Sequence, residues 1–130
     1  MSEKQVVRIG PFASAIASGV RKGDTIHLSG QVSLDAAGHV VGKGDIAAQI
    51  RQAYVNVREV LDEFGASMDD IVDETWFVTD VASVMGDIPG NFGVRTEAFG
   101  GEPQCAQTLI GVSALAMPDL MIEIKCIARV

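Results

Sequence analysis

Basic residues, aromatic residues and cysteines are all scarce in this chain of 130 residues. Ten Lys and Arg stand against 17 Asp and Glu, which gives a formal net charge of −7. This balance argues against nucleic acids and anionic membranes as partners. No apolar run approaches the roughly 20 residues of a membrane-spanning helix, and the first five residues do not resemble a signal peptide. We therefore expect a cytoplasmic protein.

The two cysteines, Cys105 and Cys126, have neither a second cysteine pair nor histidines nearby. This spacing excludes a disulfide framework and a zinc site, so we interpret both as packing residues. Aromatic residues make up 5% of the chain and hydrophobic residues 48%, with 14 glycines. A mostly aliphatic core with tight turns follows, and the length suits a single domain over residues 1–130.

The first half of the chain shows strand patterns. Val6 to Ile9 is a short apolar run that Gly10 and Pro11 end. Residues 25–34 alternate between apolar and polar, which predicts a strand buried on one side. A turn at residues 35–38 leads to a short strand over residues 39–41. The apolar residues of the alternating strand are Ile26, Leu28, Val32 and Leu34.

A long amphipathic helix follows. Asp45 is its expected N-cap, and Gly65 is expected to end it. Residues 71–79 are rich in Val, Thr and aromatic residues and predict a strand. Glycines and a proline interrupt residues 81–101, where we expect a loop and then a helix over about 90–99. The apolar stripe of the first helix comprises Ile46, Ile50, Ala53, Tyr54, Val57, Val60, Leu61 and Phe64.

Two apolar segments near the C-terminus, residues 108–114 and 120–129, read as the last strands. The segment between them contains Pro118, which predicts a turn between antiparallel neighbours. The expected order is β-β-β-α-β-α-β-β. This order predicts an α+β protein with two helices on one face of a mixed sheet.

Such an arrangement leaves one face of the sheet without helices. The residues expected there combine apolar side chains with amides and a carboxylate, which suits a self-association surface with small wet crevices between subunits. A glutamate amid an apolar strand, Glu123, also needs a reason to be there. The residues expected on this open face are His27, Ser29, Gln31, Gln107, Leu109, Gly111, Met121 and Glu123.

Several motifs in order along nearly the whole chain together carry a resemblance to a known family. They are Gly10-Pro11-Phe12; Leu28 to Val32; Gln49, Gln52, Ala53, Asn56, Leu61 and Gly65 of the helix; Phe77 to Asp80; Ile122 to Ile124; and Ile127-Ala128. This pattern resembles the RidA/YjgF (reactive intermediate/imine deaminase) family. The resemblance implies a chorismate-mutase-like fold and a homotrimer with clefts between its subunits. It also implies hydrolysis of small enamines or imines to a carbonyl compound and ammonia, without a metal or organic cofactor.

The resemblance also implies site residues. Glu123 matches the family's water-orienting carboxylate, and Ser29 and Gly30 match its strand-end substrate contacts. Two positions depart from the pattern: Gln107 stands where an Arg is expected to grip the substrate carboxylate, and Phe12 where a Tyr is expected. A charge-assisted contact contributes about 1.5–3 kcal/mol, and a neutral one about 1 kcal/mol. We therefore expect a ligand other than 2-aminoacrylate, such as a neutral imine or a molecule held by the Gln107 amide.

Other interpretations remain open. Glu123 has an alternative role in a subunit contact, His27 is a candidate base or an interface residue, and Cys105 is a candidate reactive thiol. At the level of function, the alternatives to an imine hydrolase are a non-catalytic trimer that binds small molecules or acts like a chaperone, and a deaminase in an aromatic ring-cleavage pathway.

Overall fold

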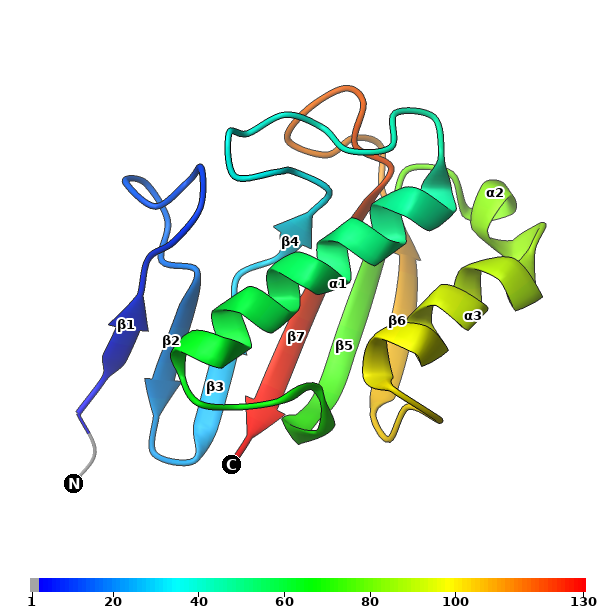
Figure 1. Ribbon diagram of the computed structural model, residues 1–130. Coiled ribbons are helices and arrows are strands. Elements are labelled where there is room, and N and C mark those ends of the chain that lie inside the picture. Colours follow the sequence, from blue (N-terminus) through cyan, green and yellow to red (C-terminus); the bar gives the residue numbers. More distant parts are fainter. Residues whose placement is uncertain (1–2) are drawn as a thin grey trace.

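The computed structural model describes residues 3–130 (Figure 1); Met1 and Ser2, part of the N-terminal stretch considered above, lie outside the described residues. The strands are β1 (Gln5–Val7), β2 (Gly19–Lys22), β3 (Thr25–Leu28), β4 (Gln31–Val32), β5 (Ile71–Val78), β6 (Ala106–Gly111) and β7 (Ile122–Arg129). The helices are α1 (Ile46–Glu63), α2 (Val81–Met85) and α3 (Ile88–Phe99), and a 3-10 turn covers Met68–Asp70. Within residues 3–130, no helix combines the length and the apolarity that crossing a bilayer requires.

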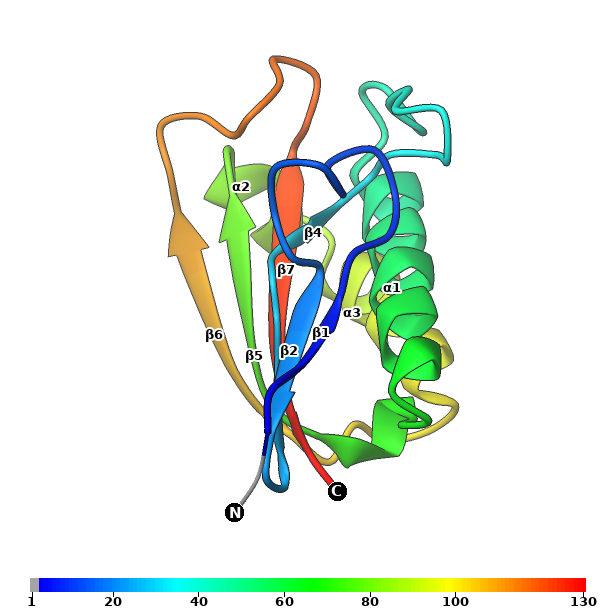
Figure 2. The same ribbon diagram turned by 90° about the vertical axis from the view of Figure 1, so that its left-hand side faces the viewer.

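All of these strands belong to one sheet. Its order is β1-β2-β3-β7-β5-β6, and β4 also pairs with β7. The β5–β6 pair is parallel and the others are antiparallel. Helices α1 and α3 lie together on one side of the sheet, and the other side is open (Figures 1 and 2). The expected α+β class, with two helices on one face of a mixed sheet, is confirmed.

Helix α1 carries the core and lies where its sequence signals predict. The Asp45 carboxylate accepts a hydrogen bond from the Ala48 N–H at 3.1 Å. Gly65, just after the helix, has a φ of +69°, a conformation that other residues rarely adopt. The apolar stripe of α1 packs against the sheet strands β3, β5 and β7 around the fully buried Trp76.

The N-terminal elements differ from the expectation in three ways. Residues 19–22 form a strand that was not among the expected elements. The strand expected over residues 25–34 is interrupted at Ser29 and Gly30, although its alternating apolar residues are all buried as predicted. Residues 39–41 form no strand; a single bridge joins Leu34 and Val40. The turn before them is present, because the Asp35 side chain accepts hydrogen bonds from backbone N–H groups of the turn.

The expected pairing of the last two strands is wrong. Strand β5 lies between β6 and β7, pairing parallel with β6 and antiparallel with β7. The physical reason is the crossover through α2 and α3, which returns the chain to the same end of the sheet, so that β6 must run parallel to β5. The segment with Pro118 is therefore a long connection over the end of β5 rather than a turn between neighbours.

The interrupted region after β5 is more helical than expected. Asp80 caps the short helix α2, and Asp87 caps α3 by accepting a hydrogen bond from the Gly90 N–H at 3.0 Å. Pro89 falls in the first turn of α3, where its missing N–H costs no helical hydrogen bond. Helix α3 thus starts at Ile88 rather than near residue 90.

Candidate functional site

The break between β3 and β4 is a bulge opposite β7. His27 pairs with Ile127, and Gln31 pairs with Ile124, so three residues (28–30) stand opposite two (125–126). The extra residue interrupts the ladder and bends the strand, as bulges beside functional sites commonly do. Gly30 therefore lies outside the regular strands, next to the part of β7 that carries Glu123 and Lys125.

Ser29 fastens a loop over this bulge. Its hydroxyl donates to the Ala17 carbonyl at 2.6 Å, and its N–H donates to the Ser18 carbonyl at 2.9 Å. The Ser18 hydroxyl in turn accepts from the Ile9 N–H and donates to the Ile9 carbonyl, each at 3.0 Å. Both ends of residues 9–18 are thereby held against the sheet. Phe12 lies in this loop and is 43% exposed.

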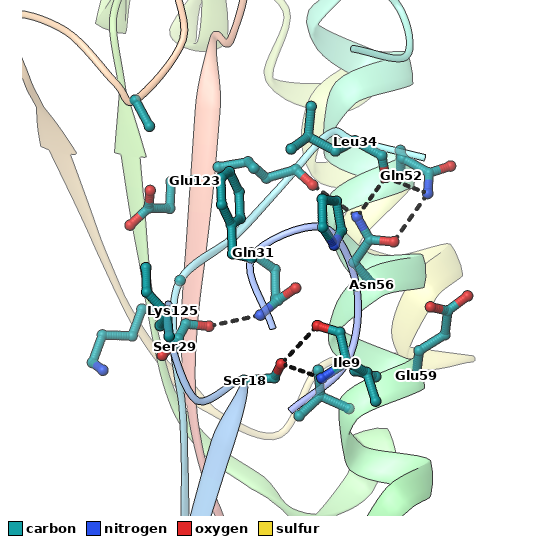
Figure 3. A pocket seen from close by; sticks show the side chains of 18 of the residues that line it. Ile9, Ser18, Ser29, Gln31, Leu34, Gln52, Asn56, Glu59, Glu123 and Lys125 are labelled. Atoms are coloured by element: carbon teal, nitrogen blue, oxygen red, sulfur yellow. Dashed lines mark hydrogen bonds between the residues drawn. The ribbon is translucent and has the colours of Figure 1, made fainter. Parts of the chain in front are cut away.

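A cavity of about 670 Å³ lies beneath this loop, between the bulge, the open face of the sheet and one edge of α1 (Figure 3). That size suits a small organic molecule. Its wall is largely apolar, and polar and charged side chains complete the lining. The apolar side chains include those of Ile9, Pro11, Phe12, Ile16, Leu34 and Phe77.

Glu123 lies near the start of β7, and its side chain lines this cavity (Figure 3). Its side chain is half-buried, and none of the ion pairs among residues 3–130 includes it. Burial raises the pKa of the Glu123 carboxyl above its ordinary value, and the positive charge of Lys125 only partly opposes this rise. The carboxylate is therefore more basic than a solvated glutamate.

Gly30 makes room for that carboxylate. A Cβ atom at residue 30 would lie 2.2 Å from Oε2 of Glu123, closer than real atoms approach. A glycine at the bulge is thus required for the Glu123 side chain to lie across the backbone. The structure brings together four of the expected site residues: Phe12, Ser29, Gly30 and Glu123 all line the cavity.

The expectation that Gln107 lies beside Glu123 is wrong. Gln107 pairs with Glu74 across β5 and β6, whereas Glu123 pairs with Phe77, so the two side chains are on opposite faces. The Gln107 amide donates to Oε2 of Glu74 at 3.0 Å, on the face that the helices cover. Leu109 shares that face and packs against the core, so its expected place on the open face is wrong as well.

The partner of Gln107 belongs to a buried polar cluster that the sequence analysis missed. Glu74 is fully buried, accepts a hydrogen bond from the Tyr54 hydroxyl at 2.7 Å and forms an ion pair with Arg95. The Trp76 ring N–H donates to the Tyr54 hydroxyl at 3.0 Å. The sequence signal for this cluster was Glu74 itself, a glutamate at a buried position of a largely apolar strand. This cluster lies on the helix side of the sheet, away from the cavity.

The remaining candidates lie apart from Glu123. His27 is exposed on β3, next to β7 on the open face. Cys105 is half-buried and accepts a hydrogen bond from Arg95 at 3.2 Å, and Cys126 is fully buried in the core. Burial raises the pKa of both thiols, which suits packing residues rather than nucleophiles. Within residues 3–130, no group of His, Cys, Asp and Glu side chains is arranged to hold a metal ion.

The structure is an α+β domain with an open sheet face and a carboxylate beside a glycine bulge, and comparison with known proteins identifies its family. Residues 3–130 match the family model described as endoribonuclease L-PSP. The chain belongs to this family, also called RidA/YjgF, as its sequence motifs indicated.

Relatives at the level of sequence cover nearly the whole chain. A RutC family protein of Pyrococcus abyssi is 33% identical over 98% of this chain and 92% of its own length. A protein of Dermatophagoides farinae named 2-iminobutanoate/2-iminopropanoate deaminase is 29% identical over 98% of this chain and 97% of its own length. The crystal structure of a member of the YjgF/YER057c/UK114 family from Mycobacterium tuberculosis superposes with a TM-score of 0.81 at 27% identity, covering 98% of this chain and all of that one.

Proposed function

We propose that this protein hydrolyses small reactive imines and enamines to a carbonyl compound and ammonia in the cavity at Glu123. The observation that carries the proposal is a half-buried glutamate with a raised pKa, free of ion pairs among the described residues, in the wall of a largely apolar cavity. Membership of the family supports it, as does the similarity to a protein named as an imine deaminase.

The chemistry needs little beyond a positioned water and a proton carrier. The imine carbon is electrophilic, so a water held by the Glu123 carboxylate attacks it while Glu123 takes the proton that the water releases. The proton then passes to the nitrogen, which gives a carbinolamine. Glu123 next takes the proton of the new hydroxyl and delivers it to the amino nitrogen as the carbon–nitrogen bond breaks, so ammonia leaves and the carbonyl forms. An enamine first takes a proton on carbon to become the imine. A carboxyl group whose pKa lies nearer neutrality can both take the proton from the water and give it up to the nitrogen.

The other expected site residues take positioning roles in this proposal. Gly30 gives the Glu123 carboxylate its place, Ser29 holds the loop over the cavity, and Phe12 forms part of the apolar wall. Gln107 has no role in it, because its amide is engaged with Glu74 on the other face of the sheet. A neutral ligand was expected because Gln107 was placed beside Glu123, and with Gln107 on the other face there is no reason to prefer one.

The direct test is ammonia release from imines that an amino-acid oxidase generates in the same tube, including 2-iminopropanoate. Acceleration above the spontaneous hydrolysis rate supports the proposal. Binding of an imine-derived carbonyl compound without any acceleration supports the alternative of a binding protein. An RNA substrate, which the family description suggests, is disfavoured by the net charge of −7 and by the carboxylates around the cavity.

A homotrimer is part of the proposal. The open face carries apolar side chains that are partly exposed, including Ile110 at 41% and Val72 at 44%, and no helix shields it (Figure 2). A surface of this kind on a small protein commonly meets another subunit. We expect sedimentation equilibrium to give three times the chain mass of 13.7 kDa. A monomer at micromolar concentration would contradict this part of the proposal.

Replacing Gly30 by Ala tests the placement of the Glu123 carboxylate. The new Cβ collides with the flexible end of Glu123 rather than with backbone, so the protein should fold while the carboxylate moves aside. A displacement of about 1 Å at a reacting group can cost up to about a hundredfold in rate, and we expect a loss of about tenfold or more in kcat/KM. Gly93→Ala is the matched control, since a Cβ at that helical residue meets no other atom within 4 Å and should leave activity unchanged. Equal activity of the two variants would show that the carboxylate position is unimportant.

A further inference from the structure

Charged side chains around the cavity are mostly acidic. Three carboxylates line it, those of Asp35, Glu59 and Glu123, and of the described residues that line the cavity only Lys125 is cationic. A 2-imino acid carries a carboxylate of its own, which three like charges on a protein of net charge −7 would repel. Any anionic ligand in this cavity therefore depends on Lys125.

Lys125 is placed to meet such a ligand. It follows Glu123 by two residues on β7 and projects from the same face of the sheet, and its side chain is half-buried. Its ammonium donates one hydrogen bond, to the Leu28 carbonyl at 3.1 Å, which leaves two of its three protons for other acceptors. Figure 3 shows that the ammonium turns away from the Glu123 carboxylate, and the two form no ion pair.

A second hollow, of about 390 Å³, adjoins the cavity at this point. Lys125, Ser29 and Ile16 line both spaces, and His27 lines only the second. Lys125 therefore stands at the boundary between the two spaces, and its ammonium is carried on a flexible side chain. It can turn toward the cavity without displacing any ion-pair partner.

The spacing of the two charges suits a 2-imino acid. Side chains two residues apart on a strand originate about 7 Å from each other. Both side chains are long and can diverge from these origins. Their charged ends can then lie far enough apart to place between them a water beside Glu123, the imine carbon that it attacks, and the carboxylate bonded to that carbon. Hydrogen bonds of about 2.8 Å at each end complete the span.

We propose that Lys125 is the specificity-determining residue of the site and that it holds the carboxylate of a 2-imino acid while the imine carbon faces Glu123. This inference rests on the proposed function for its reaction but makes a separate statement about binding. The preferred substrate class is then anionic, in contrast to the neutral ligand that the sequence suggested.

The test compares Lys125→Met, which keeps the length of the side chain without its charge, with Lys125→Arg, which keeps a cation. Substrates are 2-iminobutanoate and the neutral imine that an amine oxidase makes from butylamine. We expect Lys125→Met to lower kcat/KM for 2-iminobutanoate by about 10- to 100-fold, mostly through KM, and to change the value for the neutral imine by less than about twofold. Lys125→Arg should retain most of the activity with 2-iminobutanoate.

Binding gives a readout that does not depend on turnover. Calorimetric titration with 2-oxobutanoate should show binding by the unchanged protein that weakens with added salt and is lost in Lys125→Met. Lys22→Met, which removes the same charge from an exposed residue of β2 outside the cavity, should bind as the unchanged protein does. Retained binding in Lys125→Met, or no binding by the unchanged protein, would overturn the inference. If 2-oxobutanoate binds through Lys125 but no imine is hydrolysed, the proposed function fails and the inference stands.

Discussion

Glu123→Gln should leave the protein folded and lower its rate of imine hydrolysis by about 10²- to 10⁴-fold, the range expected when a general base is removed. Glutamine has nearly the same shape but cannot take the proton of the attacking water. Because burial raises the pKa of Glu123, the activity of the unchanged protein should rise with pH through a midpoint above the carboxyl's ordinary value of 4.5. Ammonia release measured across a pH series checks both expectations, and the residual activity of the variant should lack this midpoint.

The raised pKa of Glu123 also predicts the direction in which Glu123→Gln changes the stability of the fold. A carboxyl whose folded-state pKa is raised binds its proton more tightly in the folded than in the unfolded protein, so stability falls as the pH rises from its unfolded pKa through its folded pKa. At neutral pH the charge at Glu123 is therefore a cost, and Glu123→Gln should be at least as stable as the unchanged protein. Glu63→Gln, at the exposed end of α1, is the matched control and should keep full activity. A variant at Glu123 that remains fully active would remove the proposed mechanism.

Glu74→Ala should destabilise the protein by about 3–5 kcal/mol, the largest stability effect that we expect of any single charged residue here. Glu74 is fully buried and is the common partner of Arg95, Tyr54 and Gln107. Its removal leaves the Arg95 guanidinium, 13% exposed, without an anion. Urea unfolding followed by tryptophan fluorescence measures the change, since Trp76 lies in the same cluster.

The control for Glu74 is the surface ion pair between Arg51 and Glu97, whose oxygen and nitrogen are 3.7 Å apart. Both side chains are more than half exposed, so Glu97→Ala should cost no more than about 0.5 kcal/mol. Replacing Glu74 and Arg95 together by Met should recover part of the loss, because no charge then remains buried alone. Equal effects of the two alanine variants would show that the buried cluster contributes no more than a surface pair.

Strong periodicity explains what the sequence predicted correctly. The stripe of α1 and the alternation in β7 each bury several large apolar residues, and these fix which way the other side chains point. Glu123 was placed on the open face for this reason. Strand β6 is different, because it lies at the edge of the sheet and none of its residues is buried. The alternation of its residues therefore did not show which face carries Gln107. Its parallel pairing with β5 depends on the helical crossover through α2 and α3, which the glycines in that segment made hard to predict.

The bulge was equally invisible in the sequence. The alternation of apolar residues continues across Ser29 and Gly30, so nothing marked the extra residue opposite β7. The family resemblance supplied these two residues, and the structure added the reason: room for the Glu123 carboxylate. The alternation along β7 gives Lys125 the same face as Glu123, yet its place at the cavity depends on the loop that Ser29 fastens.

The apolar interior is divided unequally. Val32, Leu34 and Leu120 form a small cluster, with Val40, Leu115 and Met117 against it, that is separate from the main core under α1. This small cluster holds the two long connections, residues 33–45 and 112–121, against each other beside the cavity, which Val32 and Leu34 also line. Substitutions there can reshape the cavity wall while the main core continues to hold the fold. Such a division lets one scaffold acquire new ligand preferences through changes in these connections without losing its architecture.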